Sequence, residues 1–85
     1  MWQWYRIFNL NDFDALSVPD YTFSIELEGK GFQTFRIIKG LLYSVIVDGI
    51  FLTPFLNGRN GFEKDNKSAY IDEDNNLWVG YAPET

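Results

Sequence analysis

Apolar and polar residues alternate along much of this chain, and turn-forming residues interrupt the alternation at short intervals. In residues 21–28, aromatic and aliphatic side chains occupy the odd positions and polar or charged side chains occupy the even ones. Successive side chains of a β-strand point to opposite faces of its sheet, so this pattern predicts a strand with one buried and one solvated face. Alternation punctuated by Gly, Asn and Asp therefore predicts an all-β protein of antiparallel strands.

The dipeptide Asp48-Gly49 gives the strongest hairpin signal in the chain. It separates two apolar runs, residues 41–47 and 50–52, and it suits a type I′ turn, which requires positive φ at both central positions. The first run is apolar on almost all of both faces, as expected of a central strand covered on both sides. Pro54 cannot donate a ladder hydrogen bond, so the strand over residues 50–56 should end, bulge or lie at an edge there.

Six to seven short strands joined by hairpins are expected in these 85 residues. Such a chain forms either a small antiparallel barrel of the SH3-like kind or a two-layer sandwich. Residues 1–85 make one domain, because a chain of this length has room for one core. Asn, Gly and charged side chains dominate residues 57–67, which predicts a mobile loop. The one helical candidate is a single turn over residues 12–16.

The chain contains no His and no Cys. It therefore lacks the imidazole and thiolate groups that bind most transition metals, and its serines have no histidine to act as base. Any two of its 12 acidic residues could be paired as glycosidase-like carboxylates, but no pair is marked by an apolar setting that would shift a pKa. These absences predict a protein without enzymatic activity, metal or cofactor.

Charge and hydropathy disfavour two classes of partner. The formal net charge is −5, which is unsuited to a nucleic-acid partner. Residues 30–37 resemble the Lys-Gly-Phe-Gly-Phe signature of RNA-recognition and cold-shock domains, but Phe32 and Phe35 are three apart and would point to opposite faces of a strand. No apolar run approaches the ~18 residues of a membrane span, and residues 1–6 lack the features of a signal peptide. We expect a cytoplasmic protein that binds neither nucleic acid nor membrane.

Aromatic residues are abundant, with 3 Trp, 5 Tyr and 8 Phe. In the first predicted strand, alternation puts large apolar side chains on both faces, so both faces need cover. One face would carry Trp2, Trp4, Phe8 and Leu10, and the other Tyr5 and Ile7. Loop 57–67 could fold over the face that does not enter the core, or a partner protein could cover it.

The leading functional hypothesis is a binding or assembly module that contacts protein through aromatic side chains. Aromatic enrichment with few lysines is typical of interface cores. The simplest partner is a second copy of the chain, giving a homo-oligomer. The candidate interface residues are Trp2, Trp4, Tyr5, Phe8 and Phe55.

The alternative hypothesis rests on the acidic turn Asp72, Glu73 and Asp74, the one dense acidic group in the sequence. A small acidic inhibitor, of the immunity or anti-defence type, would use these carboxylates to occupy a basic cleft on a target protein. Residues 72–76 also begin like an EF-hand loop. Leu77 and Pro83 stand where that loop needs Gly and Glu, so we expect a structural turn without calcium.

The segment 72–80, Asp-Glu-Asp-Asn-Asn-Leu-Trp-Val-Gly, resembles the Asp, turn, Leu-Trp-(Ile/Val)-Gly hairpin of β-propeller blades in bacterial sensor proteins. A propeller needs at least four blades of four strands, more than 85 residues supply. The resemblance therefore implies only a β-hairpin with Trp78 packed beside it, and it implies no activity.

Overall fold

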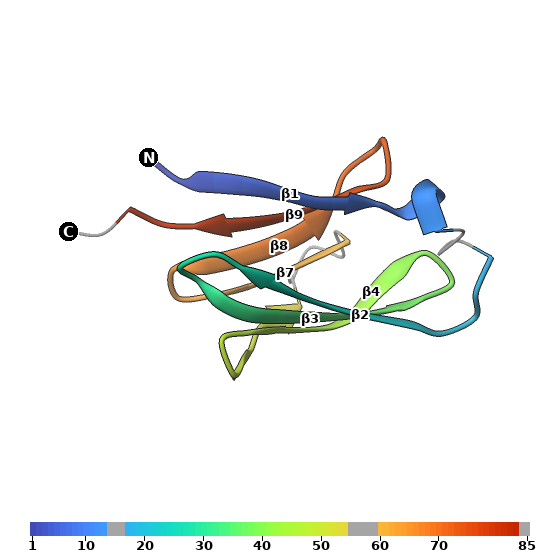
Figure 1. Ribbon diagram of the computed structural model, residues 1–85, viewed down its shortest axis with the longest axis horizontal. Coiled ribbons are helices and arrows are strands. Elements are labelled where there is room, and N and C mark those ends of the chain that lie inside the picture. The colour runs from blue at the N-terminus through green and yellow to red at the C-terminus, as the bar shows by residue number, and fades with distance from the viewer. Residues whose placement is uncertain (14–16, 55–59, 84–85) are drawn as a thin grey trace.

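The computed structural model describes residues 1–13, 17–54 and 60–83, and these form two antiparallel sheets. In sheet order, sheet A contains β1 (Gln3–Asn9), β9 (Asn76–Tyr81), β8 (Lys67–Ile71), β7 (Gly61–Lys64) and β6 (Thr53–Pro54). Sheet B contains β2 (Tyr21–Leu27), β3 (Gly31–Ile38), β4 (Leu41–Val47) and β5 (Ile50–Phe51). A short 3₁₀ helix, η1 (Leu10–Phe13), follows β1. Figure 1 shows the sheets as two layers.

The prediction of an all-β protein is confirmed, but the described strands do not close into an SH3-like barrel. Within residues 1–13, 17–54 and 60–83 the two sheets are separate, and each has two edge strands without a second strand partner. Of the expected strand over residues 50–56, residues 55 and 56 lie outside the described residues. The described part divides at the buried Leu52, so that β5 completes sheet B and β6 begins sheet A. Pro54 therefore lies in an edge strand, where its missing N–H costs no ladder bond.

The predicted hairpin turn at Asp48-Gly49 is present. The φ angles of Asp48 and Gly49 are 51° and 81°, as a two-residue type I′ turn requires, and the turn joins β4 to β5. The turn at Lys39-Gly40 has φ angles of 52° and 79° and joins β3 to β4 in the same way. The Asp48-Gly49 turn sets the register of β4 with β5, and the Lys39-Gly40 turn sets that of β3 with β4 as far as the pair Ile37 and Leu42, beyond which the register shifts by one residue.

The core fills the space between the two sheets. Apolar side chains from the inner faces of both sheets are buried there, and Phe35 of β3 has no exposed surface. Phe32 on the same strand is 62% exposed, so the two rings do point to opposite faces. The buried apolar residues are Phe8, Leu10, Phe35, Ile37, Leu42, Val45, Val47, Leu52, Phe62, Ala69, Ile71, Leu77 and Val79.

A β-bulge in β1 changes which side chains of that strand face the core. Arg6 lies opposite Trp78 and Phe8 lies opposite Leu77, so Ile7 is an extra residue in the strand. Before the bulge the even-numbered side chains of the strand point outward, and after it the even-numbered side chains point into the core. Trp2, Trp4, Phe8 and Leu10 were predicted to share one face. That prediction is wrong, because Trp2 and Trp4 are exposed while Phe8 and Leu10 are buried.

The predicted loop 57–67 contains a strand in its described part. Residues 57–59 lie outside the described residues, but 61–64 form β7, which pairs with β8 around the turn at Asp65 and Asn66. Phe62 anchors β7 because its side chain is buried in the core. The described part of this segment does not cover β1, because β9 and β8 separate β7 from β1 in the sheet.

The predicted helical turn over residues 12–16 falls partly on 14–16, which lie outside the described residues. The described part is η1, which begins two residues earlier, at Leu10. The Asn9 Oδ1 atom accepts a hydrogen bond from the Asn11 backbone N–H at 2.9 Å, which turns the chain at the end of β1. None of the described segments forms a helix long and apolar enough to cross a membrane.

Candidate protein-contact surface

Four aromatic side chains from three segments meet on the outer side of sheet A. Cross-strand pairs share a face of the sheet, and Trp4 pairs with Gly80 while Tyr70 pairs with Trp78. Their neighbours Leu77, Val79, Ala69 and Ile71 point into the core, which places this group on the opposite, outer side. We call Trp2, Trp4, Tyr70 and Trp78 the aromatic face.

Trp4 is the centre of the aromatic face. A Cβ atom at Gly80 would stand 2.6 Å from the Trp4 ring, so the indole lies directly on the Gly80 backbone. Trp2 stacks on it with ring centroids 5.8 Å apart, and the Tyr70 ring meets it edge-on at 5.4 Å. These contacts fix the orientation of an indole that is still 43% exposed.

Of the candidate interface residues, Trp2 and Trp4 lie on the aromatic face. Phe8 is only 5% exposed and stacks on Phe23 inside the protein, and Tyr5 is half-buried on the inner side of β1, with its ring 5.9 Å from that of Tyr81. Phe55 lies outside the described residues. Phe8 therefore belongs to the core, whereas Tyr5 is half-buried on the side of β1 opposite to Trp4.

Tyr70 and Trp78 were not among the residues predicted for this surface. A usable signal was present, since each lies between two apolar residues in a strand whose alternation turns it outward. What the sequence does not reveal is that β1 pairs with β9 in the register that brings Trp4 beside these rings.

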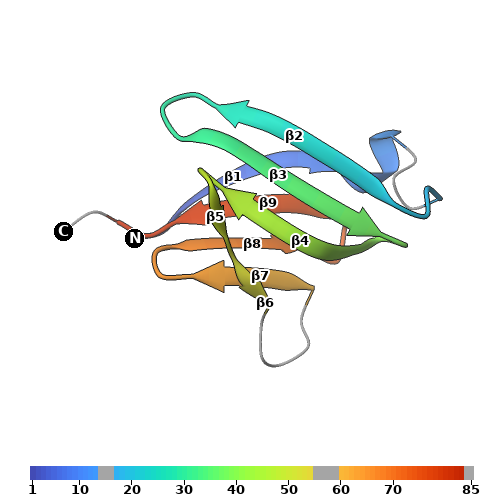
Figure 2. The ribbon, with the colours of Figure 1, turned by 90° about the horizontal axis from the view of Figure 1, so that it is seen from below.

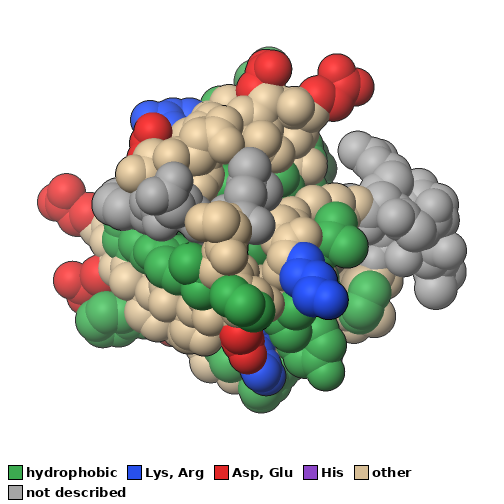
Figure 3. All heavy atoms as spheres, turned by 90° about the vertical axis from the view of Figure 1, so that its right-hand side faces the viewer, with side chains coloured by type: hydrophobic (Ala, Val, Ile, Leu, Met, Phe, Trp, Pro, Cys, Tyr) green, Lys and Arg blue, Asp and Glu red, His purple; other side chains and the backbone are tan. Residues whose placement is uncertain are grey.

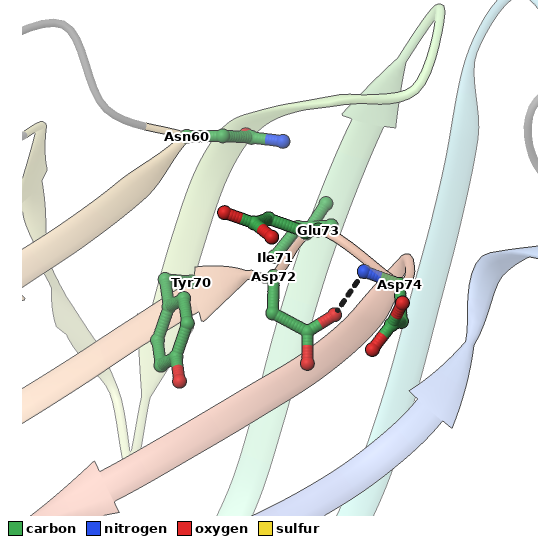
Figure 4. Close-up of a pocket in the computed structure, with 6 residues that line it drawn as sticks. All are labelled: Asn60, Tyr70, Ile71, Asp72, Glu73 and Asp74. Atoms are coloured by element: carbon green, nitrogen blue, oxygen red, sulfur yellow. Dashed lines mark hydrogen bonds between the residues drawn. The ribbon is translucent and has the colours of Figure 1, made fainter.

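The acidic turn is organised by the carboxylate of Asp72. Its Oδ2 atom accepts a hydrogen bond from the Trp78 indole N–H at 2.8 Å, and its Oδ1 accepts from the backbone N–H groups of Asn76 and Asp74, each at 2.9 Å. Figure 4 shows the Asp72 carboxylate turned toward the backbone nitrogen of Asp74. These donors, the Trp78 indole foremost, lower the pKa of Asp72 below its ordinary value.

The same turn braces the end of β1. The Asn9 side chain donates a hydrogen bond to the backbone carbonyl of Asp74 at 2.9 Å, and the Leu10 N–H donates to the carbonyl of Asn75 at 2.9 Å. The turn therefore has a structural role, and it forms the β8–β9 hairpin with Trp78 beside it that the propeller-blade resemblance implied. Of its three acids, Glu73 and Asp74 are exposed.

A pocket of about 450 Å³ lies next to the acidic turn. Figure 4 shows its lining, which comprises Asn60, Tyr70, Ile71, Asp72, Glu73 and Asp74. No cluster of three or more His, Cys, Asp or Glu side chains suited to a metal occurs in the described parts of the chain. Because Tyr70 borders both the pocket and the aromatic face, the acidic turn and the aromatic face form one continuous surface.

The opposite end of the molecule, where Met1 and Pro83 lie, carries a second pocket, of about 420 Å³. The Lys30 ammonium lies 4.9 Å from the centre of the Tyr81 ring, and burial raises the pKa of the Tyr81 hydroxyl. Gln33, three residues after Lys30, is fully buried. Its side-chain amide donates a hydrogen bond to the Gly31 backbone carbonyl at 3.0 Å. This arrangement ties the β2–β3 hairpin to the end of sheet A.

Apolar side chains are also exposed on sheet B. Phe32 and Phe51 are exposed on its outer side, and Arg36 lies over the Tyr43 ring at 5.1 Å while pairing with Asp20. Figure 3 shows one end of the molecule, where hydrophobic patches lie between polar surface and acidic side chains project from the margins. The aromatic face differs in that several of its rings contact one another.

No protein-family model, curated protein or solved structure matches this chain.

Proposed function

We propose that this chain is a non-enzymatic protein-contact module whose aromatic face binds a partner protein, most simply a second copy of itself. The observation that carries the proposal is that Trp2 and Trp4 are 38% and 43% exposed while ring contacts and Gly80 hold Trp4 in place. Held rings lose little side-chain entropy on binding, and buried Trp and Tyr supply much of the affinity at protein interfaces.

The surroundings of the aromatic face support this proposal. Arg6 lies opposite Trp78 on the outer side of sheet A. Glu63 lies on the same side, at the far end of the cross-strand row that runs from Trp4 through Gly80 and Ser68. An aromatic centre with charged groups around it is the usual composition of a protein interface, in which the rim excludes water from the centre.

A second candidate function is the acidic inhibitor, and one observation favours it. The acidic turn adjoins the aromatic face through the hydrogen bond between Asp72 and Trp78. Glu73 and Asp74 are exposed at that border, so a target with a basic cleft could meet aromatic rings and carboxylates together. Asp72 would take no direct part, because its carboxylate is occupied within the turn.

The test is the solution mass by light scattering after size exclusion, over a range of protein concentrations at low and high salt. We expect the wild-type chain to self-associate, and Trp4→Ala to weaken that association by about 30-fold or more, as for an interface hot spot. Phe32→Ala is the matched control, because it removes an exposed aromatic ring from the other sheet. High salt should leave the association largely intact, because aromatic contacts are not screened.

Self-association through the aromatic face is excluded if Trp4→Ala and Phe32→Ala have the same mass profile as the wild type while both remain folded. The inhibitor candidate predicts a different result. Capture of a basic target should slow steeply with salt and should weaken in the double variant Glu73→Gln, Asp74→Asn, which leaves Asp72 and the turn in place.

A further inference from the structure

The edges of the two sheets are not equally protected against pairing with another strand. An exposed edge offers unpaired N–H and C=O groups, and proteins blunt such edges with bulges, prolines or very short strands. β1 contains the bulge at Ile7, β6 has two residues and includes Pro54, and β5 has two residues. The remaining edge, β2, has seven residues and pairs with β3 without any register shift.

The backbone groups that β2 presents at its open edge can be identified. In an antiparallel pair, opposed residues either exchange hydrogen bonds or direct their N–H and C=O groups away from each other, in alternation. The Phe32 carbonyl accepts from the Asp48 N–H on the β4 side, so Phe32 and its partner Glu26 are a non-bonded pair. The N–H and C=O groups of Glu26, Ser24 and Thr22 therefore point out of the sheet.

We propose that β2 pairs antiparallel with β2 of a second copy of this chain, across a twofold axis at Ser24. This register places Thr22 opposite Glu26 of the second copy and Ser24 opposite its own counterpart. Every outward-pointing residue then meets another, and each such pair exchanges two hydrogen bonds. If the register were shifted by two residues in either direction, either Thr22 or Glu26 of each copy would no longer lie opposite one of these three outward-pointing residues.

The side chains of β2 also favour pairing with β2 of a second copy. On the inner face, the register places Tyr21 opposite Leu27 and Phe23 opposite Ile25 of the second copy. These four side chains are only partly buried in the single chain, and Tyr21, Phe23 and Ile25 already pack against the core. Aromatic and aliphatic side chains opposed across a strand pair stabilise it, so the second copy would complete the burial of this row.

The charges of β2 are compatible with self-pairing. Glu26 would face Thr22 and not a second carboxylate, so no like charges are opposed within the seven paired residues. Just beyond them, Asp20 would approach Glu28 of the second copy. Arg36 donates two hydrogen bonds to Asp20, at 3.0 and 2.6 Å, and supplies the compensating positive charge at that position.

The resulting dimer has a consequence for the proposed function. Rotation about a twofold axis perpendicular to sheet B does not exchange the two sides of that sheet, so sheet A lies on the same side of sheet B in both copies. Joining β2 to β2 therefore continues sheet B across the dimer and turns both aromatic faces toward one side. Such a dimer is bivalent, so a partner with two binding sites would be held more strongly than by one chain.

Two lysine variants test the register. Ser24→Lys would oppose two ammonium groups at the twofold axis, and we expect it to weaken dimerisation about tenfold or more at low salt. Thr22→Lys makes the same charge change two residues away on the same face, but it would oppose the lysine to Glu26 of the second copy. Because Thr22 is also opposite Arg36 of its own chain, the melting temperature of each variant is measured beside its mass. It should dimerise as well as the wild type or better. An equimolar mixture of Ser24→Lys and Ser24→Glu should recover the dimer.

Backbone hydrogen exchange provides a readout that needs no substitution. In a single chain, the amides of Thr22, Ser24 and Glu26 should exchange fast, while those of Phe23 and Ile25 are protected by β3. In the dimer all five should be protected. Fast exchange at Thr22, Ser24 and Glu26 at a concentration where the chain is associated would overturn the proposal, as would equal effects of Ser24→Lys and Thr22→Lys.

Four chains separate this inference from the proposed function: wild type, Trp4→Ala, Ser24→Lys and the double variant. If both surfaces self-associate, each single variant is a dimer, the double variant is a monomer, and the wild type is larger than a dimer. If Ser24→Lys matches the wild type, the pairing of β2 is wrong and the aromatic face is unaffected. If Trp4→Ala matches the wild type while Ser24→Lys is a monomer, self-association through the aromatic face is wrong.

Discussion

β1 and β2 are edge strands of equal length in different sheets, yet they expose different chemistry. Both contain seven residues, and they contact each other through the stacked rings of Phe8 and Phe23, 4.6 Å apart. Figure 2 shows each at the edge of its own layer. β1 has a bulge and places indole rings on the outer surface, whereas β2 is regular, with polar side chains outside and open backbone groups at its edge.

The difference shows what one inserted residue does to a strand. Without the bulge at Ile7, Trp4 and Phe8 would share a face, and one of the two rings would lose its present environment. With the bulge, the same strand supplies Phe8 to the core and Trp4 to the surface, and its edge is distorted against pairing. β2 keeps one alternation throughout, so its edge remains suited to another strand.

The largest expected effect comes from removing the contact between the two strands. Phe8→Ala deletes a ring that is 5% exposed and packs against Phe23 and Tyr21, so we expect it to destabilise the fold by about 3 to 5 kcal/mol. Trp4→Ala, four residues earlier on the same strand, should cost clearly less, because its ring is already partly in water. Chemical denaturation of both variants measures the difference. Equal costs would mean that the bulge does not divide the strand into inner and outer parts.

That division marks the limit of sequence reasoning for this fold. Alternation and the Asp48-Gly49 turn predicted β2 and the β4–β5 hairpin, because β2 keeps one periodicity and the turn is short. The expectation that β4 is covered on both faces is wrong, because Leu41 and Tyr43 are exposed and the register of β4 with β3 shifts beside Arg36. The prediction that Trp4 and Phe8 share a face of β1 was wrong, because the bulge adds a residue to the strand and no Gly or Pro at Ile7 signals it in the sequence. Members of the aromatic face such as Tyr70 were missed for a related reason, since only the pairing of β1, β9 and β8 brings the rings together.

A smaller effect is expected from Gly80→Ala, which sharpens the comparison on the β1 side. The new Cβ would meet the Trp4 ring at 2.6 Å, and the half-exposed indole can move away from it. We expect a loss of about 1 to 3 kcal/mol and a red-shifted, more exposed Trp fluorescence. In the Trp4→Ala background the same substitution should cost almost nothing, because the obstructing ring is gone. Additive costs in this double-mutant cycle would show that the indole does not rest on Gly80.

The smallest effect should come from the carboxylates that hold one end of each strand. Asp72 organises the turn that braces the end of β1, and Asp20 pairs with Arg36 at the start of β2. Both have lowered pKa values, Asp72 chiefly through the Trp78 indole and Asp20 chiefly through the Arg36 guanidinium. A carboxylate with a lowered folded-state pKa stabilises the protein above its unfolded pKa of about 3.9, and this contribution is lost as the pH falls through the folded-state value.

Asp72→Asn should therefore lower the melting temperature at pH 7, and its difference from the wild type should shrink as the pH falls below about 4. Asp20→Asn should show the same pH dependence with a smaller amplitude, because an ion pair exposed on both sides is screened by water and salt. Glu73→Gln is the neutral control in the same turn. Thermal melts of the three variants between pH 7 and pH 2 test the ranking. A larger effect for Asp20 than for Asp72 would mean that the start of β2, and not the end of β1, is the more strongly anchored.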